Sequence, residues 1–87
     1  MAADAIRFAR GTLALCPELR GPQLCAITDF AYNLGLGALR NSTLRKRVNA
    51  GDTQGVVTEL SKWVNGGGRR LPGLVKRRAA ETLLWLQ

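Results

Sequence analysis

The chain has 87 residues, of which 46% are hydrophobic and 22% are charged, so we expect one folded domain rather than a disordered chain. It contains two cysteines and no histidine, which excludes a Ser–His catalytic pair and argues against a zinc site, and we expect no cofactor. The net charge of +7 favours a polyanionic partner, although a solvated basic face is the simpler alternative.

The first predicted helix covers residues 2–15. It should end before Pro17, because a proline disfavours the helical conformation of the residue that precedes it. Arg7 and Arg10 interrupt its apolar residues, so we expect no secretory signal peptide. No other stretch of the sequence is apolar for long enough to cross a bilayer as a transmembrane segment.

A second helix is predicted from near Pro22 to Leu34, because apolar residues recur along it at intervals of three and four. Gly35 should end it. Cys16 and Cys25 flank the turn before this helix and could form a disulfide. Two buried thiols are the expected state, since nothing in the sequence indicates an oxidising compartment.

Two shorter helices should follow. The first exposes three consecutive basic residues and is capped by Asn41 or Ser42, whose side chain can accept a hydrogen bond from a free backbone N–H. The second is capped by Asp52. It should close at Asn65 and Gly66, because glycine tolerates the left-handed conformation at a helix end.

The last helix is predicted to start near Pro72, a residue suited to a first helical turn. Arg77 and Glu81 could pair one turn apart. No segment alternates as a strand would, so the predicted fold class is all-α: a compact bundle of four to five short helices joined by short loops. The predicted inner stripe of the last helix consists of Leu71, Val75, Ala79, Leu83 and Leu86.

The six carboxylates of the chain are scattered along the sequence. Asp52 is explained as a cap, and Asp4 and Glu81 are expected to be exposed. Two carboxylates on either side of a sugar bond cannot be assembled convincingly from this set. The glycine-rich residues 65–70 could form a nest of backbone N–H groups for an anion, but a turn between helices is the simpler interpretation.

Residues 31–52 combine groups that suit carbohydrate binding. Tyr32 and Asn33 precede a glycine-broken loop, and Ser42 and Thr43 stand beside a basic helix. Aromatic rings pack on sugar faces, and amide and hydroxyl groups hydrogen-bond to sugar hydroxyls. Taken singly, Tyr32 could be a core residue and Ser42 only a cap; together the four residues indicate a groove.

Two runs of the sequence, TDFAYNLGLGALRNSTLRKRVNAGD and LSKWVNGGGRRLPGLVKRRAAE, resemble the C-terminal lobe of phage-type lysozymes, the endolysins that cleave peptidoglycan. The resemblance covers residues 28–81, and residues 3–15 look like the end of the helix that joins the two lobes in that family. It implies that residues 1–16 are the end of the interlobe helix and residues 17–87 the helical C-terminal lobe.

The resemblance also implies how the chain is used. Tyr32 and Asn33 match the family's cleft segment and Ser42 and Thr43 match its cleft wall, so these four are the implied contacts with peptidoglycan glycan strands. The chain would be made in the bacterial host cytoplasm and act at the periplasm or cell wall. A missing N-terminal lobe, or self-association through the interlobe face, would complete the cleft.

Catalysis in this family relies on a glutamate acid, with an Asp or Cys and a Thr nearby, all in the N-terminal lobe. Neither Glu18 nor Asp29 matches one of those positions. The resemblance therefore implies no catalytic residue in this chain, and we expect the isolated chain to be inactive although it is similar to an enzyme family.

Two alternatives remain open. The basic clusters at residues 45–47, 69–70 and 76–78 could bind nucleic acid, although no recognition-helix pattern or group of stacking aromatics accompanies them. The cationic last helix could instead disrupt membranes, as basic amphipathic segments do. A terminal helix that packs on the core is the simpler interpretation of that segment.

Overall fold

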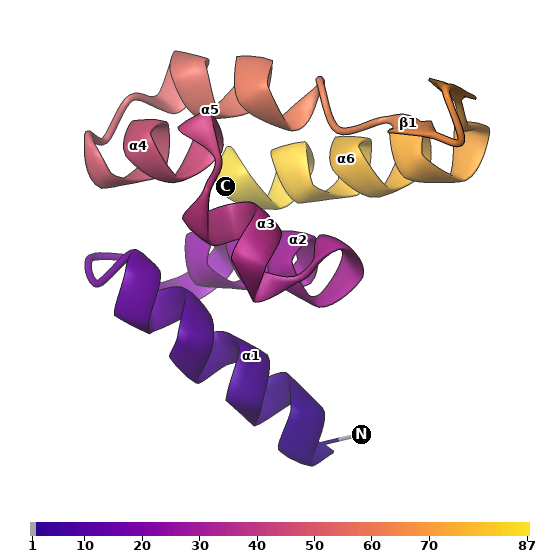
Figure 1. The fold of residues 1–87 in the computed structure, drawn as a ribbon. Coiled ribbons are helices and arrows are strands. Elements are labelled where there is room, and N and C mark those ends of the chain that lie inside the picture. The colour runs from indigo at the N-terminus through magenta and orange to yellow at the C-terminus, as the bar shows by residue number, and fades with distance from the viewer. Residues whose placement is uncertain (1) are drawn as a thin grey trace.

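The computed structural model describes residues 2–87, with side chains from Asp4 onward. This part of the chain forms six helices and one small hairpin, within 32 × 30 × 24 Å. Helix α2 (Gly21–Leu34) lies at the centre, with α1 (Ala2–Leu15) on one side and α6 (Pro72–Trp85) on the other (Figure 1). The prediction of an all-α bundle is confirmed. Within residues 2–87, no helix is both long and apolar enough to span a membrane.

The ends of α1 and α2 follow from their proline and glycine residues. α1 ends at Leu15, as predicted from Pro17. Pro22 lies in the first turn of α2, where a missing N–H removes no helical hydrogen bond. α2 ends at Gly35, whose φ of +101° only glycine adopts readily.

Three short helices follow, α3 (Leu36–Arg40), α4 (Thr43–Asn49) and α5 (Thr53–Leu60). The short helix α3 was not predicted, because the glycines on either side of Leu36 signal a loop. Its Leu39 is fully buried, so packing outweighs the weak helix propensity. The side chain of Ser42 caps α4 by accepting the backbone N–H of Arg45 at 3.1 Å, and Asp52 caps α5 as predicted.

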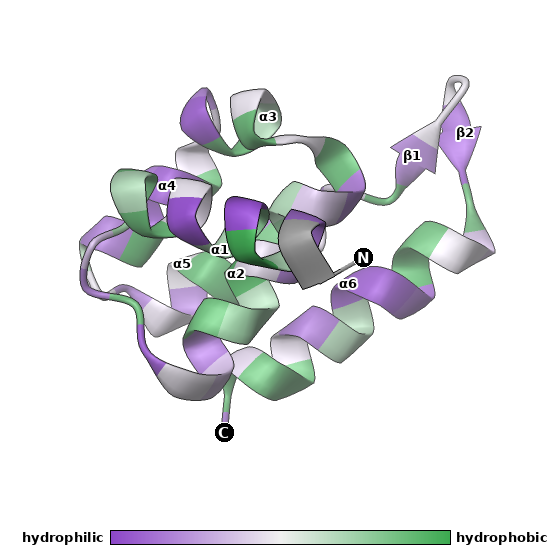
Figure 2. Cartoon of the chain, turned by 90° about the horizontal axis from the view of Figure 1, so that it is seen from below, coloured by the Kyte–Doolittle hydropathy of each residue, from purple (hydrophilic) through white to green (hydrophobic). Residues whose placement is uncertain are grey.

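The last two glycines of the triplet form the turn of a hairpin between β1 (Asn65–Gly66) and β2 (Arg69–Arg70). Gly67 and Gly68 have φ values of +59° and +82°, and a two-residue hairpin turn with φ positive at both positions favours glycine at each. Figure 2 shows the hairpin standing apart, with hydrophilic colour on both strands. The predictions of no strand, and of a helix closing at residues 65–66, are therefore wrong. Two-residue strands are too short to show alternation.

The inward face of α6 also differs from the prediction. Leu83 is 68% exposed, whereas Arg78, Glu81 and Trp85 are buried. The predicted stripe assumed that charged residues face solvent, but Arg78 and Glu81 pair with each other, which permits their burial. The expectations of an exposed Glu81 and of an Arg77–Glu81 pair are wrong for the same reason.

The buried core is formed by apolar residues from helices α2 to α6 and the α1–α2 loop, with α2 contributing most, and partly buried residues of α1 pack against it. Phe30 lies at its centre, and its ring meets that of Trp63 edge to face at 5.2 Å. Both cysteines are free. Cys16 is buried as expected, and burial raises the pKa of its thiol; Cys25 is exposed, so the expectation of a second buried thiol is wrong.

Candidate functional site

Tyr32 lies in the last turn of α2 and is half exposed. Its ring packs edge to face on Phe8 of α1, with the ring centroids 5.3 Å apart. It also lines a mainly apolar cavity of about 470 Å³ between α1 and α2, together with Leu24, Cys25 and Asp29. Tyr32 is therefore a surface residue with an accessible ring and a fixed orientation, rather than a core residue.

Asn33 follows Tyr32 but faces α6 instead of α1. Its side-chain oxygen Oδ1 accepts a hydrogen bond from Nη2 of Arg78 at 3.0 Å. The exposed part of Asn33 lines a second cavity, of about 470 Å³, whose wall includes Pro72 and Arg77 at the start of α6. The end of α2 thus presents an aromatic ring to one cavity and an amide to another.

Ser42 and Thr43 stand where α3 passes into α4. The hydroxyl of Ser42 donates to the carbonyl oxygen of Leu39 at 2.7 Å and accepts from the backbone N–H of Arg45. Ser42 is 7% exposed, and it lines a third cavity whose wall carries the cations Arg40, Arg45 and Lys46. Thr43 is exposed on the first turn of α4. Tyr32, Asn33 and Ser42 therefore line three different cavities.

A buried ion pair lies behind Asn33. The family resemblance implies packing and salt bridging for Arg78, but the sequence pattern did not reveal Glu81 as its partner. Nε and Nη2 of Arg78 donate to the two carboxylate oxygens of Glu81, each at 2.7 Å. Nη1 of Arg78 donates to the carbonyl oxygen of Trp63 at 3.3 Å, and its guanidinium lies 5.3 Å from the ring centre of Phe30. Arg78 and Glu81 are three positions apart on α6, a spacing that permits a pair. Arg77, four positions before Glu81, was expected to be the partner instead.

A comparison with protein families shows the family of the chain. The family model described as Phage lysozyme matches residues 2–81. The chain belongs to the phage lysozyme family. This membership confirms the resemblance seen in the sequence, and it lends no support to the nucleic-acid alternative.

Curated relatives support the same assignment. The endolysin of Bacillus phage B103 is 50% identical over 64 residues, which cover 74% of this chain and 24% of that endolysin. The endolysin of Acyrthosiphon pisum secondary endosymbiont phage 1 is 45% identical over 86 residues, covering 90% and 59%. The SAR-endolysin of Escherichia phage Mu is 38% identical over 63 residues, covering 72% and 37%. The chain spans less than two thirds of the length of each of these relatives.

Glu81 has one property of the acid that a phage lysozyme needs. Burial raises the pKa of its carboxyl group to about 8; a hydrogen bond with Asp29 adds to the rise, and the guanidinium of Arg78 opposes it. A general acid must also reach the leaving oxygen of the substrate. Glu81 is 1% exposed and both its oxygens are bound by Arg78, so its position makes it a structural residue.

Four of the other carboxylates of this phage lysozyme chain lie beside a cation. Oδ2 of Asp29 lies 3.7 Å from Nε of Arg77. The remaining three such pairs are Asp4 with Arg7, Asp52 with Arg47, and Glu59 with Lys62. Among residues 2–87, no group of three His, Cys, Asp or Glu side chains lies close enough to hold a metal ion. These ion pairs are single and mostly exposed, which is the arrangement of a solvated surface.

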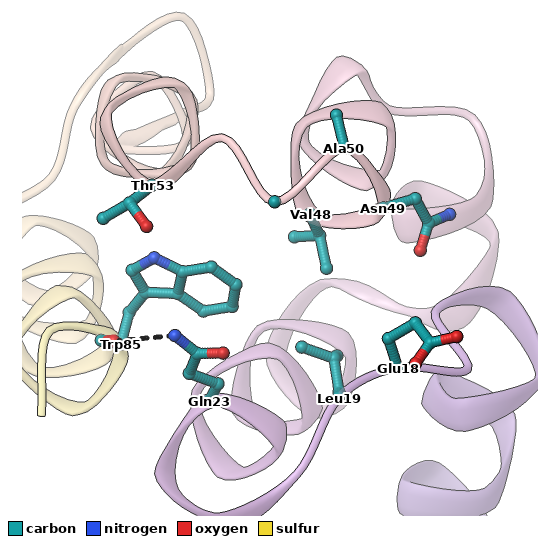
Figure 3. Close-up of a pocket in the computed structure, with 9 residues that line it drawn as sticks. Glu18, Leu19, Gln23, Val48, Asn49, Ala50, Thr53 and Trp85 are labelled. Carbon is teal, nitrogen blue, oxygen red and sulfur yellow. Dashed lines mark hydrogen bonds between the residues drawn. The ribbon is translucent and has the colours of Figure 1, made fainter.

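Glu18 lines a polar cavity of about 340 Å³ between the start of α2, the α4–α5 loop and the end of α6. Figure 3 shows the indole of Trp85 lying between Thr53 and Gln23, whose Nε2 donates to the carbonyl oxygen of Trp85 at 3.4 Å. Within the described residues that line this cavity, Glu18 is the one carboxylate. The pair of carboxyl groups that glycoside hydrolysis uses is therefore not assembled there.

Proposed function

We propose that this chain supplies the glycan-binding lobe of an endolysin that cleaves bacterial peptidoglycan. The observation that carries the proposal is the match to the phage lysozyme family over residues 2–81. The exposed Tyr32 and Asn33 at the end of α2 provide the groups that sugars need: an aromatic face and an amide.

The four residues contribute differently to binding. Tyr32 offers the free face of its ring to a sugar, and Asn33 and Thr43 offer exposed polar groups. The hydroxyl of Ser42 already donates one hydrogen bond and accepts another. Because a hydroxyl oxygen has two acceptor lone pairs, Ser42 keeps one for a sugar hydroxyl at the start of α4.

Hydrolysis would require an acid and a second carboxylate from outside the surfaces described above. We infer that residues 1–16 are the end of an interlobe helix and residues 17–87 the C-terminal lobe, although residue 1 lies outside the described part. The apolar cavity between α1 and α2 is then the surface on which an N-terminal lobe, or a second copy of the chain, would pack. We expect the 87-residue polypeptide alone to leave glycan bonds intact.

The site of action follows from the same proposal. The chain would be synthesised in the host cytoplasm and act on the wall, where its net charge of +7 favours contact with an anionic envelope.

A glycan titration followed by NMR tests the proposal. Soluble peptidoglycan glycan fragments should shift the resonances of Tyr32, Asn33, Ser42 and Thr43. Replacing Tyr32 by Ala should weaken binding about 3- to 10-fold, because an aromatic contact contributes about 0.5–1.5 kcal/mol. Binding should be unchanged in Leu86→Ala, which removes an exposed apolar side chain at the end of α6. Equal weakening in both variants, or shifts confined to other surfaces, would contradict the proposal.

A further inference from the structure

We propose that Arg78, held by Glu81, is a positioning residue that fixes the amide of Asn33 so that its NH₂ group faces the glycan. The inference rests on the proposed function, because Asn33 is a proposed glycan contact. It assigns a positioning role to Arg78 and Glu81, two buried residues that do not contact the substrate.

The orientation of Arg78 is determined by several contacts at once. The guanidinium is 2% exposed, and its two hydrogen bonds to Glu81 form a bidentate pair with both distances at 2.7 Å. It also binds the carbonyl oxygen of Trp63 and lies over the ring of Phe30. A planar group held by a bidentate partner has a fixed direction for its remaining N–H bonds. One of those bonds reaches Asn33.

The chemistry of arginine decides which way the amide points. A guanidinium carries five N–H donors and no acceptor. The amide atom that lies 3.0 Å from Nη2 of Arg78 must therefore be the oxygen of Asn33. The two N–H bonds of that amide are then not directed at Arg78. Asn33 lines a cavity together with Arg77, and we infer that these N–H bonds face it.

This orientation makes Asn33 a donor toward any ligand. Arg77 also has only donors; one edge of its guanidinium faces Asp29, and like Asn33 it offers no acceptor to this cavity wall. The carbonyl oxygen of an N-acetyl group on an amino sugar is such an acceptor, whereas the ammonium of a de-N-acetylated sugar is not. We therefore expect this site to favour N-acetylated glycan over its de-N-acetylated form.

A positioning role of the pair can be tested separately from its effect on stability. Replacing a buried ion pair by apolar residues of similar volume is often neutral or stabilising, while removing one partner leaves an unpaired buried charge. A double replacement can therefore remove the link to Asn33 and keep the fold. This separates a positioning role from a structural one.

The test compares the complete chain with the double variant Arg78→Met/Glu81→Leu above pH 8, where the carboxyl group of Glu81 is ionised. Melting by circular dichroism shows whether the variant remains folded. Titration with N-acetylated and de-N-acetylated glycan oligosaccharides, followed at the side-chain amide resonances of Asn33 and the ring resonances of Tyr32, gives the two affinities. We expect the variant to bind the N-acetylated form about 10-fold more weakly, equivalent to one hydrogen bond of about 1.4 kcal/mol. The shifts at Tyr32 should persist.

Two further variants keep the test decisive. Asn33→Asp can still accept from Arg78 but presents an acceptor to the ligand, so it should lose the preference for N-acetylated glycan. If the double variant fails to fold, Arg78→Lys retains the charge without the fork geometry, and it should lose most of the same preference. A folded double variant with wild-type affinity and preference would overturn the inference.

Failure of the inference can be distinguished from failure of the proposed function. If the wild-type chain binds neither glycan at Tyr32 or Asn33, the proposed function is wrong, and the glycan-facing role of Arg78 is wrong with it. If the wild type binds but the folded double variant does so equally well, the function stands and only the positioning role is lost.

Discussion

At the scale of single residues, the carboxyl group of Glu81 is the group through which pH acts on this fold. It faces Arg78 on its own helix and Asp29 on α2, and Asp29 in turn lies beside Arg77. Burial opposes ionisation of Glu81 and is the largest cause of its raised pKa of about 8. The folded state therefore binds a proton that the unfolded chain releases near pH 4.5.

This difference gives a pH dependence with a definite sign. Between pH 4.5 and about 8 the folded state binds more protons than the unfolded state, so the free energy of unfolding must fall as pH rises. The contribution of Glu81 is complete below pH 4.5 and is lost as pH passes through 8. Urea unfolding of the wild type and of Glu81→Gln across this range measures it.

The comparison with Glu81→Gln isolates this residue, since all other carboxylates are common to both chains. The stability of the wild type relative to Glu81→Gln should decline as pH rises from 4.5 to 8. If this relative stability rose over the same interval, the salt bridge with Arg78 rather than burial would determine the pKa of the Glu81 carboxyl group in the folded state.

At the scale of elements, the hairpin and α6 are where packing and turn geometry outweigh sequence pattern. The hairpin depends on two glycines in the left-handed region. Placing an L residue there costs about 1–2 kcal/mol, because its Cβ approaches the following carbonyl oxygen.

We expect Gly67→Ala and Gly68→Ala each to lower the free energy of unfolding by about 1–2 kcal/mol. Gly73→Ala is the matched control, because Gly73 lies in α6 without a positive φ, and a Cβ there would meet no other atom. It should be neutral or raise stability by up to about 1 kcal/mol. Chemical denaturation of the three variants makes the comparison; equal effects at all three positions would contradict the turn geometry.

The outward position of Leu83 makes a second test at this scale. Because its side chain is 68% exposed, Leu83→Lys should change stability by no more than about 0.5 kcal/mol. Leu60 is fully buried at the end of α5, so Leu60→Ala should lower the free energy of unfolding by about 2–5 kcal/mol. Thermal melts measure both, and a large loss in Leu83→Lys would restore the inner stripe predicted from the sequence.

At the scale of the whole molecule, local signals in the sequence were sufficient for most of the fold. Pro17, Pro22 and Gly35 mark helix ends through backbone geometry, and Ser42 and Asp52 mark caps through their side chains, so each acts within a few residues. The all-α class follows from these signals.

Part of what the sequence did not predict depends on contacts between distant residues. Arg78 reaches Asn33 and Trp63, which lie 45 and 15 positions away, and no periodicity encodes such links. The proposed contacts Tyr32, Asn33, Ser42 and Thr43 could be named from the family resemblance. Their distribution over separate cavities required the structure.

The adjacency of Tyr32 and Asn33 on α2 has one more consequence, for the footprint of the bound saccharide. Neighbouring positions on an α-helix diverge by about 100° around the axis, and here one side chain leans on Phe8 while the other is tethered to Arg78. If both residues contact glycan, as proposed, we expect the strand to straddle the tip of α2 and a disaccharide to be the shortest oligomer that engages both residues.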